Sequence, residues 1–359
     1  MDKITEIFDQ FRTGFKFRSF KELKTGHINQ SFLITTDSGK QLFLQKVNEG
    51  VFKDPIKLAH NFNILSLYVK PWIEKESPYS FPKFYYAHKY LPFLEDEQGG
   101  YWRLMDYIEN THSFSMSSKP SIAYEAATAY GIFQKALLIP SKDAFYTTIT
   151  SFRNLNMRIR SLKSAIKRDI KKRKKSANAE INAIIRKKNI NNKNQTLIKK
   201  KKKKKLITHN DTKLDNILFD KNSLKAKAVV DYDTIQPGYL IYDFGDMVRS
   251  FCNPVEEDIS DLKKIHINTD MLAAVLEGFA GEIGDLVSQA DKESLSLGVK
   301  VIIYMQAIRF LTDYLNGDIY YKTDDPEQNL KRCRNQLKLL ENYIQQEAEI
   351  QKIIKKYLQ

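Results

Sequence analysis

The chain has 359 residues, of which 42% are hydrophobic and 12% aromatic, so it can build a real core, and its length suits two lobes or domains. Its two cysteines, Cys252 and Cys333, lack metal or redox spacing, which favours a reducing compartment. The N-terminus has no apolar stretch after a basic start, and no run of 18 apolar residues occurs. We therefore expect neither a signal peptide nor a membrane span, and we predict a cytoplasmic protein.

The net charge of +15 is concentrated in one segment. Residues 163–205 contain 19 lysines and arginines but only two acids, so the rest of the chain is close to neutral. The segment has three interpretations: a solvated helical excursion, a contact with nucleic acid or another polyanion, or electrostatic steering of a phosphorylated substrate. Few aromatic residues are interleaved with the basic ones, so stacking on bases has little support and the first interpretation is favoured.

Short alternating apolar runs in the first 106 residues predict an antiparallel sheet. After a helix over 1–13, residues 15–47 read as a three-stranded meander with a hairpin turn at 37–40. The turn around Gly26 would cover the phosphates of a nucleotide. A helix begins at Pro55, and two further strands over 79–88 and 100–108 bring the sheet to five strands.

Helical periodicity dominates the rest of the chain. We predict an α+β fold, with a nucleotide-binding N-lobe over 1–106 and a mostly helical C-lobe over 107–359 that includes the Lys-rich helical segment 163–205. The predicted helices cover 122–138, 145–166, 257–264, 270–289, 293–316 and 327–357.

Three polar residues flank a predicted β-hairpin. Its strands are the apolar runs 217–219 and 228–230; Asn216 precedes the first and Asp231 follows the second. Asp211 lies five residues before Asn216. An amide oxygen beside a carboxylate suits Mg²⁺, and a second carboxylate can accept a hydroxyl proton. This spacing is typical of ATP-dependent phosphoryl transfer.

The stretches 209–216 and 230–234 resemble the aminoglycoside phosphotransferase and choline kinase superfamily, and within it the bacterial N-acetylhexosamine 1-kinases. The resemblance implies a bilobal protein-kinase-like fold and transfer of the γ-phosphoryl group of ATP, with Mg²⁺, to the anomeric hydroxyl of N-acetylglucosamine or N-acetylgalactosamine. It implies that Asp211 is the catalytic base and that Asn216 and Asp231 bind Mg²⁺. Supporting stretches lie at 26–32, 44–55, 233–246 and 309–318.

The resemblance also implies binding residues for ATP and for the acceptor. The strand 42–46 should offer a group to the nucleotide phosphates; a kinase-like register points to Gln45, with Lys46 on the opposite face, and both stay candidates. The ATP candidates are Gly26, Gln45, Lys46, Asp106 and Ile108. The acceptor candidates are His27, Asp233, Arg309 and Tyr320.

Two further expectations concern charged residues in predicted helices. Arg309 stands in an apolar helix, so we expect it to be paired, with Asp313 at i+4 as the candidate partner. Asp243 begins an Asp-Phe-Gly triplet but lies beyond the hairpin, so we predict a helix N-cap or loop-fixing role rather than a metal ligand.

The acceptor stays open, because Gln30 stands where the sugar kinases often carry an acidic residue. One alternative is a related kinase acting on choline, homoserine or another amino alcohol. Another is a non-catalytic kinase-like module that binds polyanions through 163–205. The expected partners are ATP and a small-molecule acceptor rather than a membrane or nucleic acid, and the sequence does not predict an oligomeric state.

Overall fold

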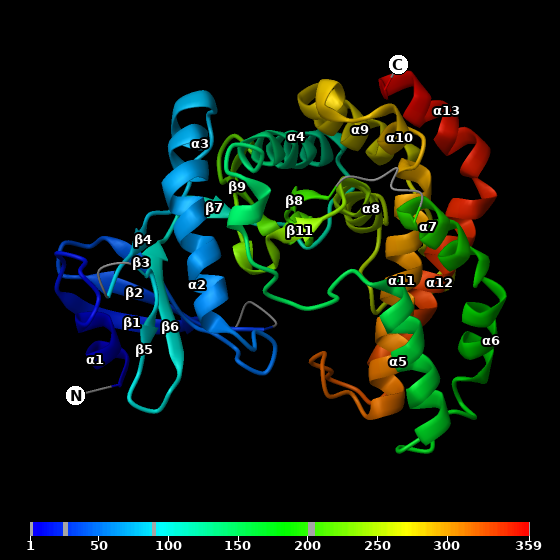
Figure 1. The fold of residues 1–359 in the computed structure, drawn as a ribbon, viewed down its shortest axis with the longest axis horizontal. Helices are drawn as coiled ribbons and strands as arrows, with labels where there is room; N and C mark the ends of the chain where they lie inside the picture. Colours follow the sequence, from blue (N-terminus) through cyan, green and yellow to red (C-terminus); the bar gives the residue numbers. More distant parts are fainter. Residues whose placement is uncertain (1–2, 24–27, 88–90, 200–204, 359) are drawn as a thin grey trace. The chain divides into compact units, whose positions relative to one another are not determined.

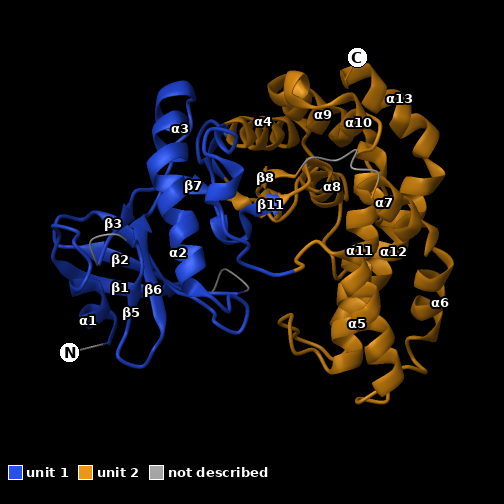
Figure 2. Ribbon diagram, in the orientation of Figure 1, with its two compact units in different colours: residues 1–112, 136–150, 218–237 blue, residues 113–135, 151–217, 238–359 orange. Residues whose placement is uncertain are grey.

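The computed structural model describes residues 3–23, 28–87, 91–199 and 205–358, which form two compact units (Figures 1 and 2). The first unit contains 1–112, 136–150 and 218–237, and the second contains 113–135, 151–217 and 238–359. Each unit is assembled from three separate stretches of chain, so no single position divides them. The lobe boundary after Asp106 therefore stays a prediction.

A six-stranded antiparallel sheet is the frame of the first unit. The predicted meander is present, and the acidic turn after Phe93 gains a short additional strand, β5, that pairs with β6. The strand order is β1 (Phe17–Leu23), β2 (Gln30–Thr36), β3 (Gln41–Lys46), β6 (Tyr101–Asp106) and β4 (Phe84–Tyr85), with β5 (Leu94–Glu95) on β6. This sheet, together with a mostly helical second unit, confirms the predicted α+β fold.

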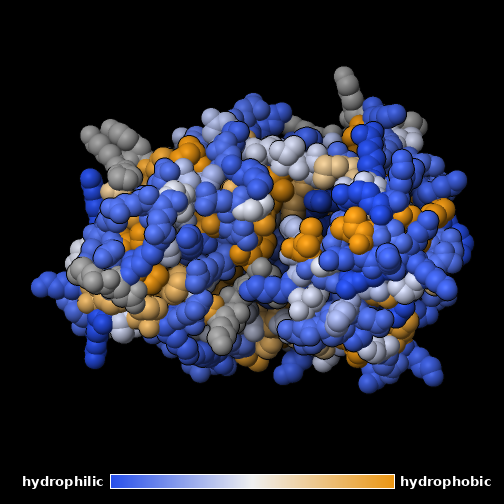
Figure 3. All heavy atoms as spheres, turned by 90° about the horizontal axis from the view of Figure 1, so that it is seen from below, coloured by the Kyte–Doolittle hydropathy of each residue, from blue (hydrophilic) through white to orange (hydrophobic). Residues whose placement is uncertain are grey.

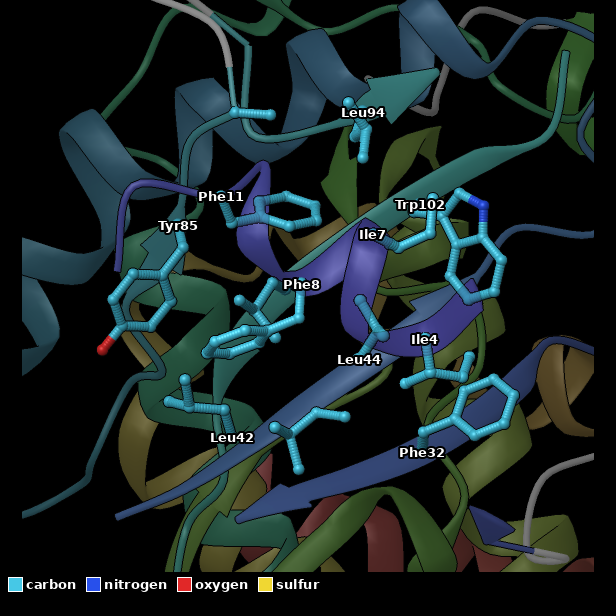
Figure 4. Packing of buried hydrophobic residues seen from close by; sticks show 13 residues of the cluster. Ile4, Ile7, Phe8, Phe11, Phe32, Leu42, Leu44, Tyr85, Leu94 and Trp102 are labelled. Carbon is cyan, nitrogen blue, oxygen red and sulfur yellow. The ribbon is translucent and has the colours of Figure 1, made fainter. Parts of the chain in front are cut away.

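One face of the sheet packs against the N-terminal helix α1 (Lys3–Asp9). Figure 4 shows Ile4, Ile7 and Phe8 of this helix over the sheet residues, among them Leu42 and Leu44, which are fully buried. These two leucines are two apart in β3 and point to the same face, as strand periodicity requires. The core of this unit therefore lies between α1 and the sheet.

The helix predicted from Pro55 is present and longer than expected. Asp54 caps α2 (Pro55–Ile64) by accepting a hydrogen bond from Lys57 N, and Pro55 occupies the first turn. A π-helical turn (Leu65–Val69) leads into α3 (Lys70–Glu76). The wide turn ends just before Pro71, which has no N–H for the regular ladder.

Helix α11 (Leu295–Asn316) is the centre of the second unit, where α5, α8 and α12 pack against it (Figure 1). It is long and apolar enough to cross a membrane, but 78% of its most apolar window is buried, as in the core helix of a globular protein. Hydrophilic side chains cover most of the face shown in Figure 3. The helices are α4 (Pro120–Ala136), α5 (Leu155–Arg168), α6 (Asn178–Arg186), α7 (Asn189–Lys199), α8 (Leu240–Phe251), α9 (Thr269–Ile283), α10 (Gln289–Lys292), α11, α12 (Gln328–Gln345) and α13 (Glu347–Leu358).

Several predicted helix boundaries are wrong. The helix predicted over 145–166 begins only at α5, because the backbone N–H groups of Thr148 and Ile149 donate to the side chain of Gln236. The helix predicted over 257–264 is a short 3₁₀ turn (Leu262–Lys264), and the one over 327–357 is broken at Gln346.

The Lys-rich segment folds into parts of α5, α6 and α7 and uses one apolar face for packing. Ile181 and Ile184 are buried, and the hydroxyl of Tyr304 in α11 donates to the carbonyl of Ile184 at 2.9 Å. Arg173 donates to the carbonyl of Tyr314 at 2.9 Å and pairs with Asp318. The described residues of this segment are largely helical, and their apolar side chains are part of the core of the second unit.

The crossing of α8 and α11 depends on glycine. A Cβ atom on Gly298 would lie 2.3 Å from the carbonyl oxygen of Ile241, whereas one on Gly281, in α9, would meet nothing within 4 Å. We expect Gly298→Ala to lower the free energy of unfolding by about 1–3 kcal/mol through overpacking. Gly281→Ala, the matched control, should be neutral or stabilising by up to about 1 kcal/mol. Urea unfolding measures both, and equal effects of the two substitutions would contradict the close helix contact.

Candidate active site

The loop 209–216 of the second unit carries Asp211 and is held by side chains from α4, from α8 and from the turn just before α5. From α4, the hydroxyl of Tyr130 donates to the carbonyl of Lys213 at 2.7 Å. From the turn just before α5, the guanidinium of Arg153 donates to the carbonyl of Asn210. These bonds satisfy carbonyl groups that a non-helical loop would otherwise leave unpaired.

Asp243, in the first turn of α8, fixes the backbone before Asp211. Its carboxylate accepts hydrogen bonds from the backbone N–H of His209 at 2.8 Å and of Asn210 at 2.9 Å, and its carbonyl accepts from the hydroxyl of Thr212 at 2.6 Å. Complete burial raises the pKa of Asp243 to about 7, against the opposing effects of Arg153 and the two N–H groups. The contacts are those of the predicted loop-fixing residue.

One turn further along α8, Asp246 anchors two arginines. Its carboxylate accepts from Arg153 at 2.7 Å and from Arg249 at 2.7 Å, and Arg249 also pairs with Glu257. Burial opposes ionisation of Asp246, but the two guanidinium groups outweigh it and hold its pKa well below the usual range. Arg153 thus connects α8 to the loop through Asp246 on one side and Asn210 on the other.

Asp211 itself remains partly accessible, with 22% of its side chain exposed. The ammonium group of Lys213 lies 3.4 Å from its carboxylate, and the side-chain amide of Asn216 donates to that carboxylate at 3.0 Å and to the Asp211 carbonyl at 2.8 Å. The carboxylate is therefore held by two donors while its outer side is open, an arrangement that suits a general base.

The donor set of this loop fits Mg²⁺. Both described hydrogen bonds of the Asn216 side chain are donated by its amide nitrogen. Its amide oxygen therefore stays available as a ligand. Among the described residues, no group of three or more His, Cys, Asp or Glu side chains is arranged to hold a metal ion. Mg²⁺ is usually bound by one or two protein ligands together with substrate phosphates and water.

The predicted hairpin is present in the first unit as β9 (Ile217–Asp220) and β10 (Ala226–Val229), and β7 (Thr111–His112) joins it. Asp231 follows β10, is exposed, and adopts the left-handed conformation with φ 64°. Such backbone conformations recur at ligand-binding positions, and Asp tolerates them better than most residues. The predicted role of Asp231 as a metal ligand stays a prediction.

Asp233 lies in a buried polar network of the first unit. Its carboxylate pairs with Arg103 of β6 and accepts from the amide of Asn29 at 2.7 Å. Arg103 also donates to the side-chain carbonyl of Gln45, whose amide donates to Ser31 at 2.9 Å. Both carboxylate oxygens of Asp233 are therefore used within the unit, and its predicted contact with an acceptor stays a prediction.

The other candidates for ATP binding lie around β3 and the end of β6. Gln45 and Lys46 point to opposite faces of β3: Gln45 towards Arg103, and Lys46 over the ring of Trp102, 5.5 Å from its centroid. The carboxylate of Asp106 pairs with Lys40 at 2.9 Å and accepts from the hydroxyl of Tyr85 at 3.0 Å; the carbonyl of Ile108 accepts from Thr111. Gly26 and His27 lie outside the described residues.

Arg309 and Tyr320 meet in the second unit. The guanidinium of Arg309 lies 5.6 Å from the ring centroid of Tyr320 and 5.4 Å from that of Tyr321. The expected pair of Arg309 with Asp313 is wrong: the Asp313 carboxylate accepts from the backbone N–H groups of residues 319–321 and from Asn329. No ion pair of Arg309 occurs among the described residues, where Gln306 is its hydrogen-bond partner at 3.0 Å.

The family of the chain follows from a match over residues 19–264 to the model of the phosphotransferase enzyme family. The chain belongs to this family.

Solved structures share the kinase-like fold at low identity. An aminoglycoside phosphotransferase from Alicyclobacillus acidocaldarius matches with a TM-score of 0.59 and 12% identity, covering 98% of this chain and 94% of that one. Spectinomycin phosphotransferase, in complex with ADP and spectinomycin, matches with a TM-score of 0.55 and 12% identity, covering 98% of each chain. Choline kinase from Cryptosporidium parvum matches at 0.55 and 14% identity, covering 92% and 90%.

Sequence reasoning missed the residues that support the site. Arg153 and Asp246 join α5 and α8 across 93 positions, and Arg103 and Asp233 join β6 to the turn after β10 across 130. No local pattern links such residues. The only available signal was the unusual presence of charged residues within apolar stretches, as for Arg103 between Trp102 and Leu104.

Replacing one partner of the buried Arg103–Asp233 pair should be costly. We expect Arg103→Met to lower the free energy of unfolding by about 3–5 kcal/mol, because it leaves the Asp233 carboxylate buried without its cation. The double substitution Arg103→Met with Asp233→Leu should recover part of this loss, which denaturant unfolding of the four proteins in a double-mutant cycle measures. If the effects of the two single substitutions on the free energy of unfolding simply added in the double variant, a direct interaction between Arg103 and Asp233 would be contradicted.

The raised pKa of Asp243 should make the free energy of unfolding depend on pH in a defined direction. Between pH 3.8 and about 7 the folded chain keeps a proton on Asp243 that the unfolded chain has released. The resulting stabilisation is complete below pH 3.8 and is lost as the pH rises through about 7. Because Asn does not titrate, the stability of the wild type relative to Asp243→Asn should fall between pH 5 and pH 8 in urea unfolding. A constant difference would show that Asp243 titrates normally.

Proposed function

We propose that the protein is an ATP- and Mg²⁺-dependent kinase that phosphorylates a hydroxyl group of a small molecule, with Asp211 as the general base. The observation that carries this proposal is the braced, partly exposed Asp211 carboxylate beside Lys213 and Asn216. Membership of the phosphotransferase enzyme family supports the reaction class.

In the proposed reaction, Asp211 orients the acceptor hydroxyl and accepts its proton as the oxygen attacks the γ-phosphorus of ATP. The ammonium group of Lys213 holds the Asp211 carboxylate in place through their close approach. Asn216 and Asp231 are the proposed Mg²⁺ ligands, and bound Mg²⁺ would offset negative charge on the phosphate oxygens. The loop bonds from Asp243 and Arg153 position the base before substrate arrives.

ATP contacts are proposed for the first unit. Gln45, Lys46, Asp106 and Ile108 are the candidates described there, with Gly26 as a further one from the sequence. Lys46 offers an ammonium group and Gln45 an amide, and both kinds of donor can bind phosphate oxygens. The guanidinium of Arg103, on the same face of the sheet as Gln45, is already paired with Asp233.

For the acceptor, we propose the anomeric hydroxyl of an N-acetylhexosamine, with Arg309, Tyr320, Asp233 and His27 as candidate contacts. The support is the resemblance of the sequence to the sugar 1-kinases. An amino alcohol such as choline is the alternative, favoured by the likeness to a choline kinase. The aromatic rings around position 309 already surround a guanidinium, which argues against a second cation in the same place.

Substitution of Asp211 tests the proposal. We expect Asp211→Asn to reduce kcat by roughly 10²–10⁴-fold, because the amide cannot accept the hydroxyl proton. The assay measures ADP release with ATP, Mg²⁺ and a panel containing N-acetylglucosamine, N-acetylgalactosamine and choline. Asp215→Asn is the matched control on the same loop and should retain activity within a few-fold.

Full turnover by Asp211→Asn, or equal losses for both aspartates, would contradict the assignment of the base. Activation by choline alone would identify the amino-alcohol kinase instead.

A further inference from the structure

Two arginines of the second unit are partly buried yet have no carboxylate partner among its described residues. Arg158, on α5, and Arg309, on α11, make no ion pair among the residues of 113–135, 151–199, 205–217 and 238–358. Arg158 donates from Nη2 to the carbonyl of Phe152 at 3.0 Å, but its buried Nε has no hydrogen-bond partner. A buried donor left unpaired, on a charged group, is costly and is rare in folded proteins.

The two guanidinium groups also meet at Phe152: Arg158 donates to its carbonyl, and Arg309 lies 5.8 Å from its ring centroid. Burial, and after it repulsion from Arg309, lowers the pKa of Arg158 to about 10. Asp246 and Glu257 are engaged with other arginines, and Asp211, whose charge also acts on Arg309, forms no ion pair with either group among the described residues. Positive charge without an ion-pair partner is therefore concentrated beside α5 and α11, which pack side by side (Figure 1).

Surrounding groups fix the direction of Arg309 without neutralising it. The rings of Phe152, Tyr320 and Tyr321 lie 5.4–5.8 Å from the guanidinium carbon, and Nη1 of Arg309 donates a hydrogen bond to the side-chain oxygen of Gln306. Gln306 in turn donates to the hydroxyl of Tyr321 at 3.3 Å. Cation–π contacts orient a guanidinium and contribute modestly, but they leave its N–H edge for an anion.

The cluster belongs to the same unit as the proposed base. Arg153, whose charge also acts on Arg158, binds the carbonyl of Asn210, the residue before Asp211. Asp211 is among the charges that act on Arg309. Phe152, which both arginines contact, directly precedes Arg153, so a short chain of contacts links the two guanidinium groups to the loop of the proposed base.

We propose that Arg158 and Arg309 form a binding site for an acidic group on the acceptor, so that the preferred acceptor is a sugar bearing a carboxylate or a phosphate. This inference rests on the proposed kinase function and narrows its acceptor class. Two guanidinium forks can hold the oxygens of such a group through charge-assisted hydrogen bonds, which also satisfy the unpaired Nε of Arg158. A choline-like acceptor is disfavoured by the same charges.

Without a bound ligand, the unpaired charge of this site should lower the stability of the protein. We expect Arg158→Met to raise Tm, since it removes a buried charge that lies beside Arg309 and has no counter-ion. Arg160→Met, on the exposed side of α5, is the matched control and should leave Tm nearly unchanged. A clear loss of Tm in Arg158→Met alone would show that Arg158 is a structural residue and would overturn the proposal.

Ligand binding tests the site independently of turnover. Isothermal titration would compare glucuronate with glucose, and N-acetylglucosamine 6-phosphate with N-acetylglucosamine. We expect at least one acidic member to bind at least about tenfold more tightly than its neutral partner, as charge-assisted hydrogen bonds predict. Arg158→Gln should abolish this preference, Arg158→Lys should restore part of it, and Arg160→Gln should retain it.

Equal binding of acidic and neutral sugars by the wild type would overturn the proposal. It would also be overturned if Arg158→Gln weakened ATP or inorganic phosphate but no acceptor, since the anion would then belong to the nucleotide. A preserved preference for acidic sugars without any ADP release would instead reject the kinase function while leaving the anion site intact.

Discussion

The second unit depends on the way α8 holds the loop before Asp211. Two carboxylates on successive turns of this helix act differently. Asp243 accepts hydrogen bonds from backbone N–H groups of the loop, whereas Asp246 pairs with Arg153, which donates to the carbonyl of Asn210. The loop has no helical or strand ladder of its own over these residues, so these side chains replace it. A general base needs a fixed position more than it needs strong local secondary structure, and the rigid helix α8 supplies that position.

The same arrangement accounts for the left-handed backbone of Asn210, with φ 64°. Asn accepts this conformation at modest cost, and the bonds to its N–H and carbonyl hold it there. The glycine at position 238 is part of the same packing, because a Cβ atom there would lie 2.1 Å from the hydroxyl of Thr208. Close packing around the loop thus restricts its backbone conformation and the size of the side chains that can pack against it.

Much of the fold was predictable from the sequence because its signals are local. Alternation in Leu42 and Leu44 identified a strand with one buried face, and Asp54–Pro55 marked a helix start. The failures have physical reasons. The apolar spacing from Phe145 to Phe152 mimics a helix, yet its backbone bonds to the distant Gln236. The partner of Arg309 could not be predicted either, because Asp313 at i+4 is taken by a loop whose fold the periodicity does not reveal.

The basic segment shows how charge and packing can coexist. Its lysines account for the net charge, but Ile181, Ile184 and Arg173 attach it to α11 and to the turn that carries Asp318. Residues after that turn include Tyr320 and Tyr321, which contact Arg309. The segment therefore supports the turn that leads to the proposed acceptor contacts, whatever its outer face does.

The central claim is that this chain transfers a phosphoryl group to an acceptor hydroxyl rather than to water. The most direct measurement is ³¹P NMR of a reaction containing ATP, Mg²⁺ and neutral or acidic N-acetylhexosamines. We expect a new phosphate monoester signal, coupled to the sugar and formed in step with ADP. Formation of inorganic phosphate alone, or no consumption of ATP with any acceptor, would contradict it.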